Sequence, residues 1–160
     1  MAARPPIYLY TDGASSGNPG PGGWGAVLCC GNYRKELSGG YSLTTNNRME
    51  LMGVITGLEH LTKSCRVEVI SDSQYVCKAF NEHWIDGWIK AGLRQGTNKK
   101  VKNPDLWNRL LDAMEGHEVS FTWVKGHAGH EQNERCDRLA TAAADGDNLF
   151  TDEYYMSTVG

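Results

Sequence analysis

Four acidic residues stand at the edges of four different predicted elements of this 160-residue chain. They are Asp12, Glu50, Asp72 and Asp137. The first and third end strand patterns at residues 7–12 and 67–72, Glu50 lies in the first turn of a predicted helix, and Asp137 lies inside a late helix. Open α/β sheets bind ligands at the carboxyl ends of their strands, so we expect the four carboxylates to meet there. Their charges would repel one another without a cation, and all-oxygen ligands favour Mg²⁺ or Mn²⁺.

Each acid taken alone has an ordinary structural alternative. Asp12 and the glycine after it form a common turn pair. Glu50 fits a capping box if Asn47 is the N-cap of its helix. Asp72 can cap the following helix, although the serine after it can do so too, and Asp137 can be a solvated helix residue. These alternatives do not explain the sequences that surround the four acids.

Hydrophobic periodicity and turn residues predict the elements that must position these acids. Short links between consecutive strands indicate antiparallel hairpins, whereas the strand that follows the first helix should lie parallel to the first strand. The predicted strands are residues 7–12, 24–30, 33–44, 67–72 and 119–124. The predicted helices are one that has Glu50 in its first turn and an apolar pattern from Leu51 to Leu61, residues 74–91 with a break near Gly87 or Gly92, a helix from Asn103-Pro104-Asp105 to Gly116, and residues 131–144. A turn is predicted at residues 17–25 and a loop at residues 92–102.

Five stretches around the four acids resemble ribonuclease H, most closely the bacterial type 1 enzyme. They are Thr11–Gly13, Asn46–Leu51, Ser71–Val76, Trp123–His127 and Asn133–Asp137. The resemblance covers residues 7–144, and five motifs in the right order are far more specific than any one of them. It implies an α/β fold with a mixed five-stranded sheet in the order 3-2-1-4-5, strand 2 antiparallel, and helices on both faces. We expect a single ribonuclease H domain at residues 1–145 and a polar, mobile tail at residues 146–160.

The resemblance implies an endonuclease that hydrolyses the RNA strand of RNA–DNA hybrids and leaves 3′-hydroxyl and 5′-phosphate ends. Such an activity removes RNA primers and R-loops. Two Mg²⁺ ions in the substrate complex, with Mn²⁺ as a substitute, can activate water and relieve charge on the leaving oxygen. The family pattern gives Asp12 as the bridge between the metals, Glu50 and Asp72 as ligands of one, and Asp137 as a ligand of the other. His127 matches the histidine that assists proton transfer or product departure, a role that the ordinary pKa of a histidine side chain, about 6.5, suits.

Substrate contacts implied by the resemblance divide into two groups. Amide and hydroxyl side chains reach the minor groove of the hybrid or a DNA phosphate, and amides can read the 2′-hydroxyl that distinguishes RNA from DNA. This group is Asn18, Thr45, Asn46, Asn47 and Gln74. A basic protrusion grips the DNA strand through cations beside a stacking surface. Its members are Trp84, Trp88, Lys90, Arg94, Lys99 and Lys100. Turn, helix-cap and packing roles remain alternatives for the asparagines and the two tryptophans.

Two departures from close relatives bear on affinity rather than on chemistry. Apolar residues occupy places in the protrusion that could have carried cations or an aromatic side chain. They are Ile89, Ala91 and Leu93. Cys29 stands where some relatives place a basic residue for a DNA phosphate, which leaves Thr45 and Asn18 for that pocket.

Two other interpretations of these motifs, a dinucleotide-binding site and a zinc site, are rejected, and two alternative functions are kept. The segment Gly20–Gly25 matches a dinucleotide-binding fingerprint, but it leads into a strand instead of a helix. A zinc site at His127, His130 and Cys136 matches no common spacing and lacks a fourth ligand. The rivals are a transposase or integrase nuclease of the same fold, which would cut duplex DNA, and a hybrid-binding module without catalysis, which metal-dependent turnover would exclude.

The distribution of charge indicates the kind of ligand, and the cysteine content indicates the redox state of the compartment. The chain carries a net charge of −3, but residues 84–102 hold five basic residues and one acid, so the remainder carries −7. A basic segment on an acidic body suggests a polyanion contact at one place. The five cysteines, an odd number without Cys-x-x-Cys spacing, indicate a reducing compartment. We see neither a signal region nor a membrane-spanning run, and expect a cytoplasmic monomer, with a single-stranded-DNA-binding protein or other replication partners left open.

Overall fold

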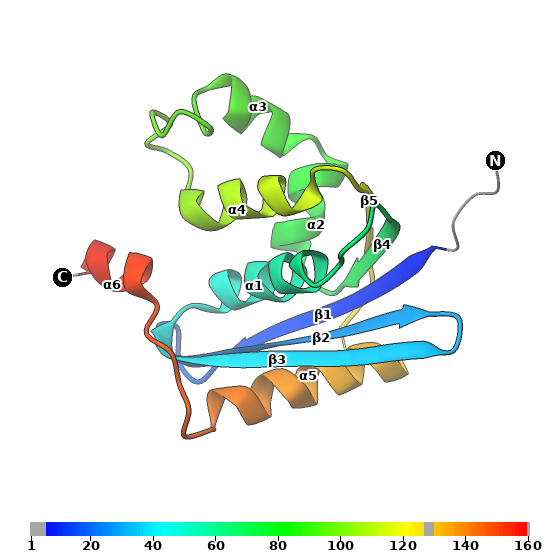
Figure 1. Ribbon diagram of the computed structural model, residues 1–160. Coiled ribbons are helices and arrows are strands. Elements are labelled where there is room, and N and C mark those ends of the chain that lie inside the picture. The colour runs from blue at the N-terminus through cyan, green and yellow to red at the C-terminus, as the bar shows by residue number, and fades with distance from the viewer. Residues whose placement is uncertain (1–5, 127–129, 160) are drawn as a thin grey trace.

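A five-stranded mixed sheet forms the centre of the computed structural model, which describes residues 6–126 and 130–159 (Figure 1). The strands are β1 (Ile7–Ser15), β2 (Gly20–Cys30), β3 (Tyr33–Thr44), β4 (Arg66–Ser71) and β5 (Glu118–Trp123). Their order is β3-β2-β1-β4-β5. β2 runs antiparallel to β1 and β3, whereas β1, β4 and β5 are parallel. The predicted order and direction of the strands are therefore confirmed.

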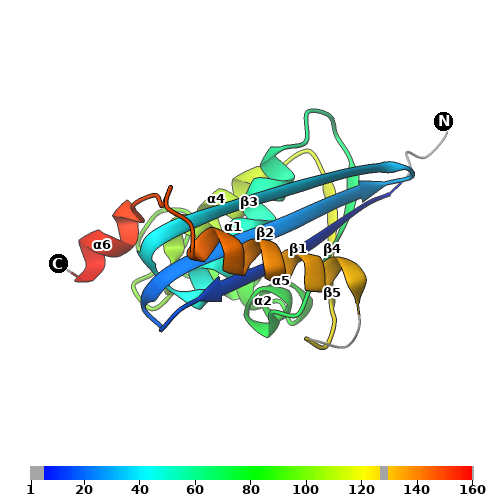
Figure 2. The same cartoon turned by 90° about the horizontal axis from the view of Figure 1, so that it is seen from below.

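Helices cover both faces of the sheet, as expected. They are α1 (Asn46–Glu59), α2 (Gln74–Asn81), α3 (Trp84–Lys90), α4 (Pro104–Met114), α5 (Glu131–Ala144) and α6 (Glu153–Val159). α1 packs on β1 and β2 with α4 on its outer side, while α5 lies across the opposite face (Figures 1 and 2). None of the helices in the described ranges is long and apolar enough to cross a membrane.

The main core lies between the sheet and the helices α1, α2 and α4. The periodic apolar residues of α1, from Leu51 to Leu58, are buried as the sequence pattern predicts. They face Leu9 and Val69 of the two central strands, and Trp107 of α4 is fully buried on the far side. Each such large apolar side chain contributes about 1.5–3 kcal/mol when it leaves water. This packing fixes α1, and with it Glu50, against the end of β1.

A row of glycines lets α5 lie unusually close to the sheet. A Cβ atom added at Gly23 would stand 2.2 Å from the carbonyl oxygen of Ala140, and one at Gly25 would stand 2.4 Å from that of Cys136. Both distances are far below van der Waals contact, so side chains there would push α5 away. These glycines belong to β2, which corrects the turn predicted at residues 17–25: only residues 16–19 lie between β1 and β2. Their role is close approach of a helix, not chain reversal.

One helix boundary after β4 differs from the prediction, whereas the start of α4 at Asn103-Pro104 is confirmed. The helical stretch breaks between α2 and α3, where His83 has a φ of 60°, and not at Gly87 or Gly92. Gly87 lies inside α3 in open space, where a missing side chain costs only about 1 kcal/mol. Asn103 precedes α4 with a φ of 56° and makes no capping hydrogen bond. Its side chain instead accepts from Arg48 and donates to the hydroxyl of Tyr75.

The segment after Asp145 differs from the mobile polar tail that its composition predicts. It ends in α6, and Phe150 pairs with Tyr41 beside the sheet. Asp152 is only 7% exposed and accepts hydrogen bonds from Thr44 Oγ1 at 2.6 Å and from Arg48. The polar residues of this segment therefore include one that anchors it to the body.

Candidate active site

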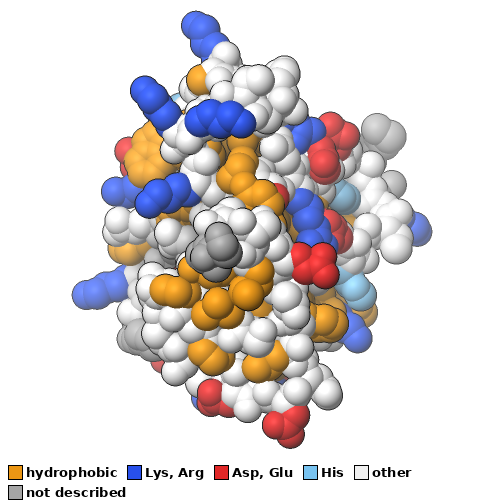
Figure 3. Space-filling view, turned by 90° about the vertical axis from the view of Figure 1, so that its left-hand side faces the viewer, with side chains coloured by type: hydrophobic (Ala, Val, Ile, Leu, Met, Phe, Trp, Pro, Cys, Tyr) orange, Lys and Arg blue, Asp and Glu red, His pale blue; other side chains and the backbone are white. Residues whose placement is uncertain are grey.

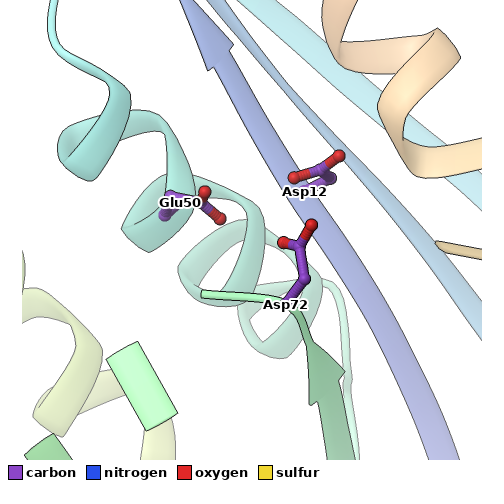
Figure 4. A group of neighbouring side chains, drawn as sticks. All are labelled: Asp12, Glu50 and Asp72. Atoms are coloured by element: carbon purple, nitrogen blue, oxygen red, sulfur yellow. The ribbon is translucent and has the colours of Figure 1, made fainter. Parts of the chain in front are cut away.

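Three carboxylates that are far apart in the sequence converge at one end of the sheet. Asp12 comes from β1, Glu50 from the first turns of α1, and Asp72 from the residue after β4. One oxygen from each can be chosen so that all lie within 4.8 Å of one another. Figure 4 shows the three side chains turned toward a common point. This convergence is the one that the sequence pattern predicts.

Strand register and a helix cap explain this convergence. β1 and β4 are parallel with Thr11 opposite Ser71, so the next residue on each strand emerges at the same level. The α1 helix begins with Thr45 as its N-cap, whose hydroxyl accepts from the Arg48 amide at 3.3 Å. Glu50 therefore lies beyond the capping position, and the capping-box alternative with Asn47 is wrong. In the same way Ser73, not Asp72, caps α2.

Burial and mutual repulsion raise the pKa of two of the carboxyl groups, those of Asp12 and Glu50, when no cation is present. Burial, together with the charges of Asp72 and Asp137, raises the pKa of Asp12 to about 8, although the Gly13 amide acts in the opposite direction. The pKa of Glu50 lies well above its ordinary value, mainly through burial. Glu50 Oε2 is buried without a hydrogen-bond partner. A buried acceptor of this kind is costly unless something binds it, and a divalent cation fits both this atom and the surplus negative charge.

Asp137 lies beside the cluster of three without belonging to it. It lines a small cavity with Asp12 and Asp72, and its charge and a side-chain hydrogen bond help to raise the pKa of Asp12. Asp137 is carried by α5, the helix that approaches the sheet over the glycines of β2. The four acids thus occupy one place, with the fourth on the opposite side of Asp12 from Glu50's helix.

Three residues that sequence reasoning did not single out support Asp72 and its strand. Trp123 donates its indole N–H to the carbonyl oxygen of Asp72 at 3.0 Å, and Asn133 donates to the carbonyl of Ile70 at 3.2 Å. Gly126 lies so close that an added Cβ atom would stand 2.7 Å from Asp72 Oδ2. Such contacts depend on the tertiary fold, and only the presence of these residues inside the family-like motifs could have marked them.

We expect Gly126→Ala to lower cleavage activity roughly 10- to 100-fold, the range typical for residues that support a metal ligand. The new methyl group would displace the Asp72 carboxylate from the cluster. Activity should recover in part at higher Mg²⁺ concentration, which a titration of rate against Mg²⁺ checks. Gly146→Ala is the control, because an added Cβ atom there would make only ordinary van der Waals contact, 3.4 Å from the carbonyl oxygen of Ala143. An unchanged Mg²⁺ requirement in Gly126→Ala would contradict this role.

The predicted amide contacts gather near the start of α1. Asn18 is exposed and accepts a hydrogen bond from the Asn46 amide at 3.2 Å, so the turn after β1 is tied to the first residue of α1. Asn47 and Gln74 are exposed at the beginnings of their helices, while Thr45 is half-buried as the cap. Asn18 and Asn47 can therefore serve the local structure and still present polar atoms to solvent.

The predicted basic protrusion comprises α3 and residues 91–102. Lys90, Lys99 and Lys100 are exposed. Arg94 is engaged with α4, donating to the side chain and carbonyl of Asn108 and forming an ion pair with Asp112.

Trp84 is 42% exposed, whereas Trp88 is half-buried with its ring centroid 5.1 Å from that of Trp107. Trp88 therefore packs the protrusion onto α4, and Trp84 presents a free aromatic surface to solvent.

Two other residues named from the sequence, Cys29 and His127, are not part of the site as described. Cys29 lines an apolar pocket with Tyr33 at the far end of β2, away from Asn18, so it does not share the pocket predicted with Asn18 and Thr45. His127 lies outside the described residues.

A groove of about 800 Å³ separates the protrusion from the body. Figure 3 views this side of the molecule, where Lys and Arg side chains gather over the upper part. The groove is lined by residues of the β1–β2 turn, the start of α1, the loop before α4, the start of α4, and α6. It includes the predicted Asn18, Thr45, Asn47 and Lys99, but also Lys102, Tyr154 and Tyr155, which were not predicted as site residues.

Comparison with known proteins agrees with this geometry. A family model described as RNase H matches residues 4–145. A ribonuclease H of Lachnoclostridium phytofermentans is 62% identical, with 91% of this chain and 96% of that protein covered. One of Syntrophotalea carbinolica is 57% identical, with coverage of 90% and 95%.

Two solved structures are also similar. LC9-RNase H1, described as a type 1 RNase H with the type 2 active-site motif, has a TM-score of 0.81 at 30% identity, covering 100% of this chain and 83% of that one. LC11-RNase H1, solved in complex with an RNA/DNA hybrid, has a TM-score of 0.63 at 28% identity, with coverage of 87% and 96%. The likeness thus extends over nearly all of the fold described above.

Proposed function

The chain belongs to the ribonuclease H family, and we propose that it is an endonuclease that hydrolyses the RNA strand of RNA–DNA hybrids. The observation that carries this proposal is the convergence of Asp12, Glu50 and Asp72, with a buried and unpaired oxygen on Glu50. The relative that was solved with an RNA/DNA hybrid supports the choice of substrate. Removal of RNA primers and R-loops is the physiological role that follows.

Two Mg²⁺ ions, or Mn²⁺ in their place, would supply activation of water and stabilisation of charge on the leaving oxygen. We propose that the four acids would hold these ions: Asp12 would be shared by both, Glu50 and Asp72 would be the further ligands of one, and Asp137 would be the further ligand of the other. The raised pKa of Asp12 means that this residue gives up a proton when a cation binds, so cation affinity should increase with pH. His127 is proposed to move a proton or assist product departure.

Recognition of the hybrid is proposed to come from two surfaces. Asn18, Asn46, Asn47 and Gln74 would read base edges and the 2′-hydroxyl in the minor groove, with Thr45 beside them at a DNA phosphate. On the other side of the groove, Trp84 and the protrusion's cations would hold the backbone of the DNA strand. The exposure of Lys90, Lys99 and Lys100 supports that role. Arg94, which pairs with Asp112, and Trp88, which packs on Trp107, also help to hold the protrusion on α4.

The proposal includes a single ribonuclease H domain at residues 1–145 that acts as a cytoplasmic monomer. All five cysteines are free, which supports a reducing compartment. Light scattering of the purified chain tests the monomer, and limited proteolysis tests the boundary near residue 145.

The proposed function is tested with four labelled substrates in the presence of Mg²⁺: an RNA–DNA hybrid, single-stranded RNA, duplex RNA and duplex DNA. We expect cleavage of the RNA strand of the hybrid alone, lost with EDTA and with Asp72→Asn. Tight hybrid binding without cleavage would instead indicate a binding module. Cleavage of duplex DNA would place the chain with transposase-like nucleases.

Hybrid binding should weaken with rising salt if the protrusion dominates affinity. Each phosphate contact contributes about −0.9 to the slope of log affinity against log salt concentration. The double variant Lys99→Ala/Lys100→Ala should therefore flatten that slope by about 1 to 2. Fluorescence anisotropy with a labelled hybrid at several salt concentrations measures it, with Lys63→Ala, an exposed lysine outside the protrusion, as control. A flat response of the unmodified chain between low and moderate ionic strength would count against a dominant protrusion.

A further inference from the structure

The C-terminal helix α6 forms part of the wall of the groove that lies beneath the protrusion. Tyr154, Tyr155 and Thr158 line this groove together with Asn47 of α1 and Lys99 and Lys102 of the loop before α4. Figure 1 shows α6 and that loop on the same side of the molecule. A segment that the sequence presents only as an acidic tail is thus placed among the residues proposed to bind the hybrid.

A buried ion-pair network holds α6 in this position. Arg48 is 2% exposed and donates through Nε and Nη2 to the carboxylate of Asp152 at 2.7 and 3.0 Å. The same guanidinium forms a two-pronged contact with Asp105 of α4, at 2.9 and 2.7 Å. The Tyr155 amide donates to Asp152 Oδ1 at 3.3 Å. Because Arg48 follows Asn47 directly in α1, the position of α6 is coupled to the residues that approach the minor groove.

The groove side of α6 has the chemistry of a nucleic-acid backbone contact. The negative charge of Asp152 is compensated by Arg48, which also lies 5.3 Å from the ring centroid of Tyr154. Tyr154 is nevertheless 40% exposed, and tyrosine supplies both a flat ring and a hydroxyl donor. Lys99 and Lys102 are exposed on the opposite wall. Aromatic surface and hydroxyl groups facing two cations match a sugar–phosphate chain.

We propose that α6 is part of the hybrid-binding surface and that Tyr154 and Tyr155 contact the sugar–phosphate backbone of the strand that occupies this groove. The inference rests on the proposed function and adds to it a contact that lies outside the predicted amide group and protrusion. The two tyrosines are binding residues without a part in the chemical step. Their loss should therefore raise KM and leave kcat unchanged.

The test uses the full chain with the double substitution Tyr154→Ala/Tyr155→Ala and, separately, Tyr154→Phe/Tyr155→Phe. We expect the alanine variant to raise KM for the hybrid about 5- to 20-fold at unchanged kcat, the size of effect expected when one or two hydrogen bonds to backbone oxygens are lost. The phenylalanine variant should recover part of this loss, because it keeps the rings but not the hydroxyl groups. Met156→Ala, an exposed substitution on α6 outside the groove lining, is the matched control.

Thermal unfolding and hybrid binding separate the outcomes. A variant that binds the hybrid as tightly as the unmodified chain overturns the inference, and so does one with a lower KM, which would make α6 an obstruction. A KM increase equal to that of Met156→Ala also overturns it, since that would reflect disturbance of the helix alone. Failure of the unmodified chain to cleave or bind the hybrid would contradict the proposed function itself. Cleavage by the unmodified chain with no effect of the tyrosine substitutions would contradict only the role of α6.

Discussion

Asp12→Asn should lower the rate of hybrid cleavage at least ~10³-fold and, with no metal bound, stabilise the fold. The loss of rate follows because the central ligand disappears, and metal assistance is worth several kcal/mol in the transition state, where about 1.4 kcal/mol is tenfold. The gain in stability follows because Asp12 is 8% exposed and surrounded by other carboxylates. An amide of the same shape removes that repulsion.

The stability effect has a definite dependence on pH. The pKa of Asp12 rises from 3.8 to about 8 on folding, so its contribution to the free energy of unfolding is complete below pH 4 and is lost as the pH rises toward 8. In EDTA, Asp12→Asn should therefore be more stable than the unmodified chain at pH 8, by on the order of 2 kcal/mol. The two should converge near pH 4.

Urea unfolding at pH 4, 6 and 8, with and without Mg²⁺, measures this prediction. Mg²⁺ should stabilise the unmodified chain most at pH 8, because the cation replaces the proton, and should have little effect on the variant. Asp147→Asn, the same change at an exposed position, is the control. If Asp12→Asn is no more stable than the unmodified chain at pH 8 in EDTA, the burial and repulsion assigned to Asp12 are wrong.

Arg48→Met should lower the free energy of unfolding by about 3–5 kcal/mol, the cost of removing one partner from a buried ion pair. Two carboxylates, on Asp105 and Asp152, would lose their shared cation. Arg109→Met is the control, because Arg109 pairs with Glu59 at the surface with both side chains more than a third exposed. Such exposed pairs contribute about 0–1 kcal/mol.

Urea unfolding at pH 7 compares the two arginine variants directly. The larger effect of Arg48→Met should be accompanied by faster proteolysis in residues 146–160, because α6 loses its attachment. Equal destabilisation by the two substitutions would show that the network around Arg48 contributes no more than a surface pair.

The central sheet was predictable because its determinants are local. The hairpin links fix the antiparallel strands, and a helix between residues 46 and 59 forces β4 to run parallel to β1. Once β1 and β4 are parallel neighbours, the residues that follow them must meet, which is why Asp12 and Asp72 converge. Glu50 follows from the apolar residues of α1, which pack between the sheet and α4 and so fix the rotation of that helix.

The features that the sequence did not reveal depend on contacts between distant segments. Asp152 is 104 residues from Arg48, and no sequence pattern around either residue predicts their ion pair. The burial of Trp88 against Trp107 and the pairing of Arg94 with Asp112 likewise depend on how the protrusion folds onto α4. The helix break falls at His83, whose backbone adopts a left-handed conformation with a φ of 60°, and no glycine marks this position in the sequence.

The most direct test of the central claim is the identity of the ends left on the RNA strand. A hybrid with a 5′-labelled RNA strand is cleaved with Mg²⁺, and the products are analysed by gel mobility and mass spectrometry, with EDTA and Asp12→Asn as controls. Attack by water assisted at the four acids predicts 3′-hydroxyl and 5′-phosphate ends and no cleavage in either control. Fragments ending in a 2′,3′-cyclic phosphate, or cleavage that persists in EDTA, would mean that the RNA 2′-hydroxyl is the nucleophile and would contradict the role assigned to Asp12, Glu50, Asp72 and Asp137.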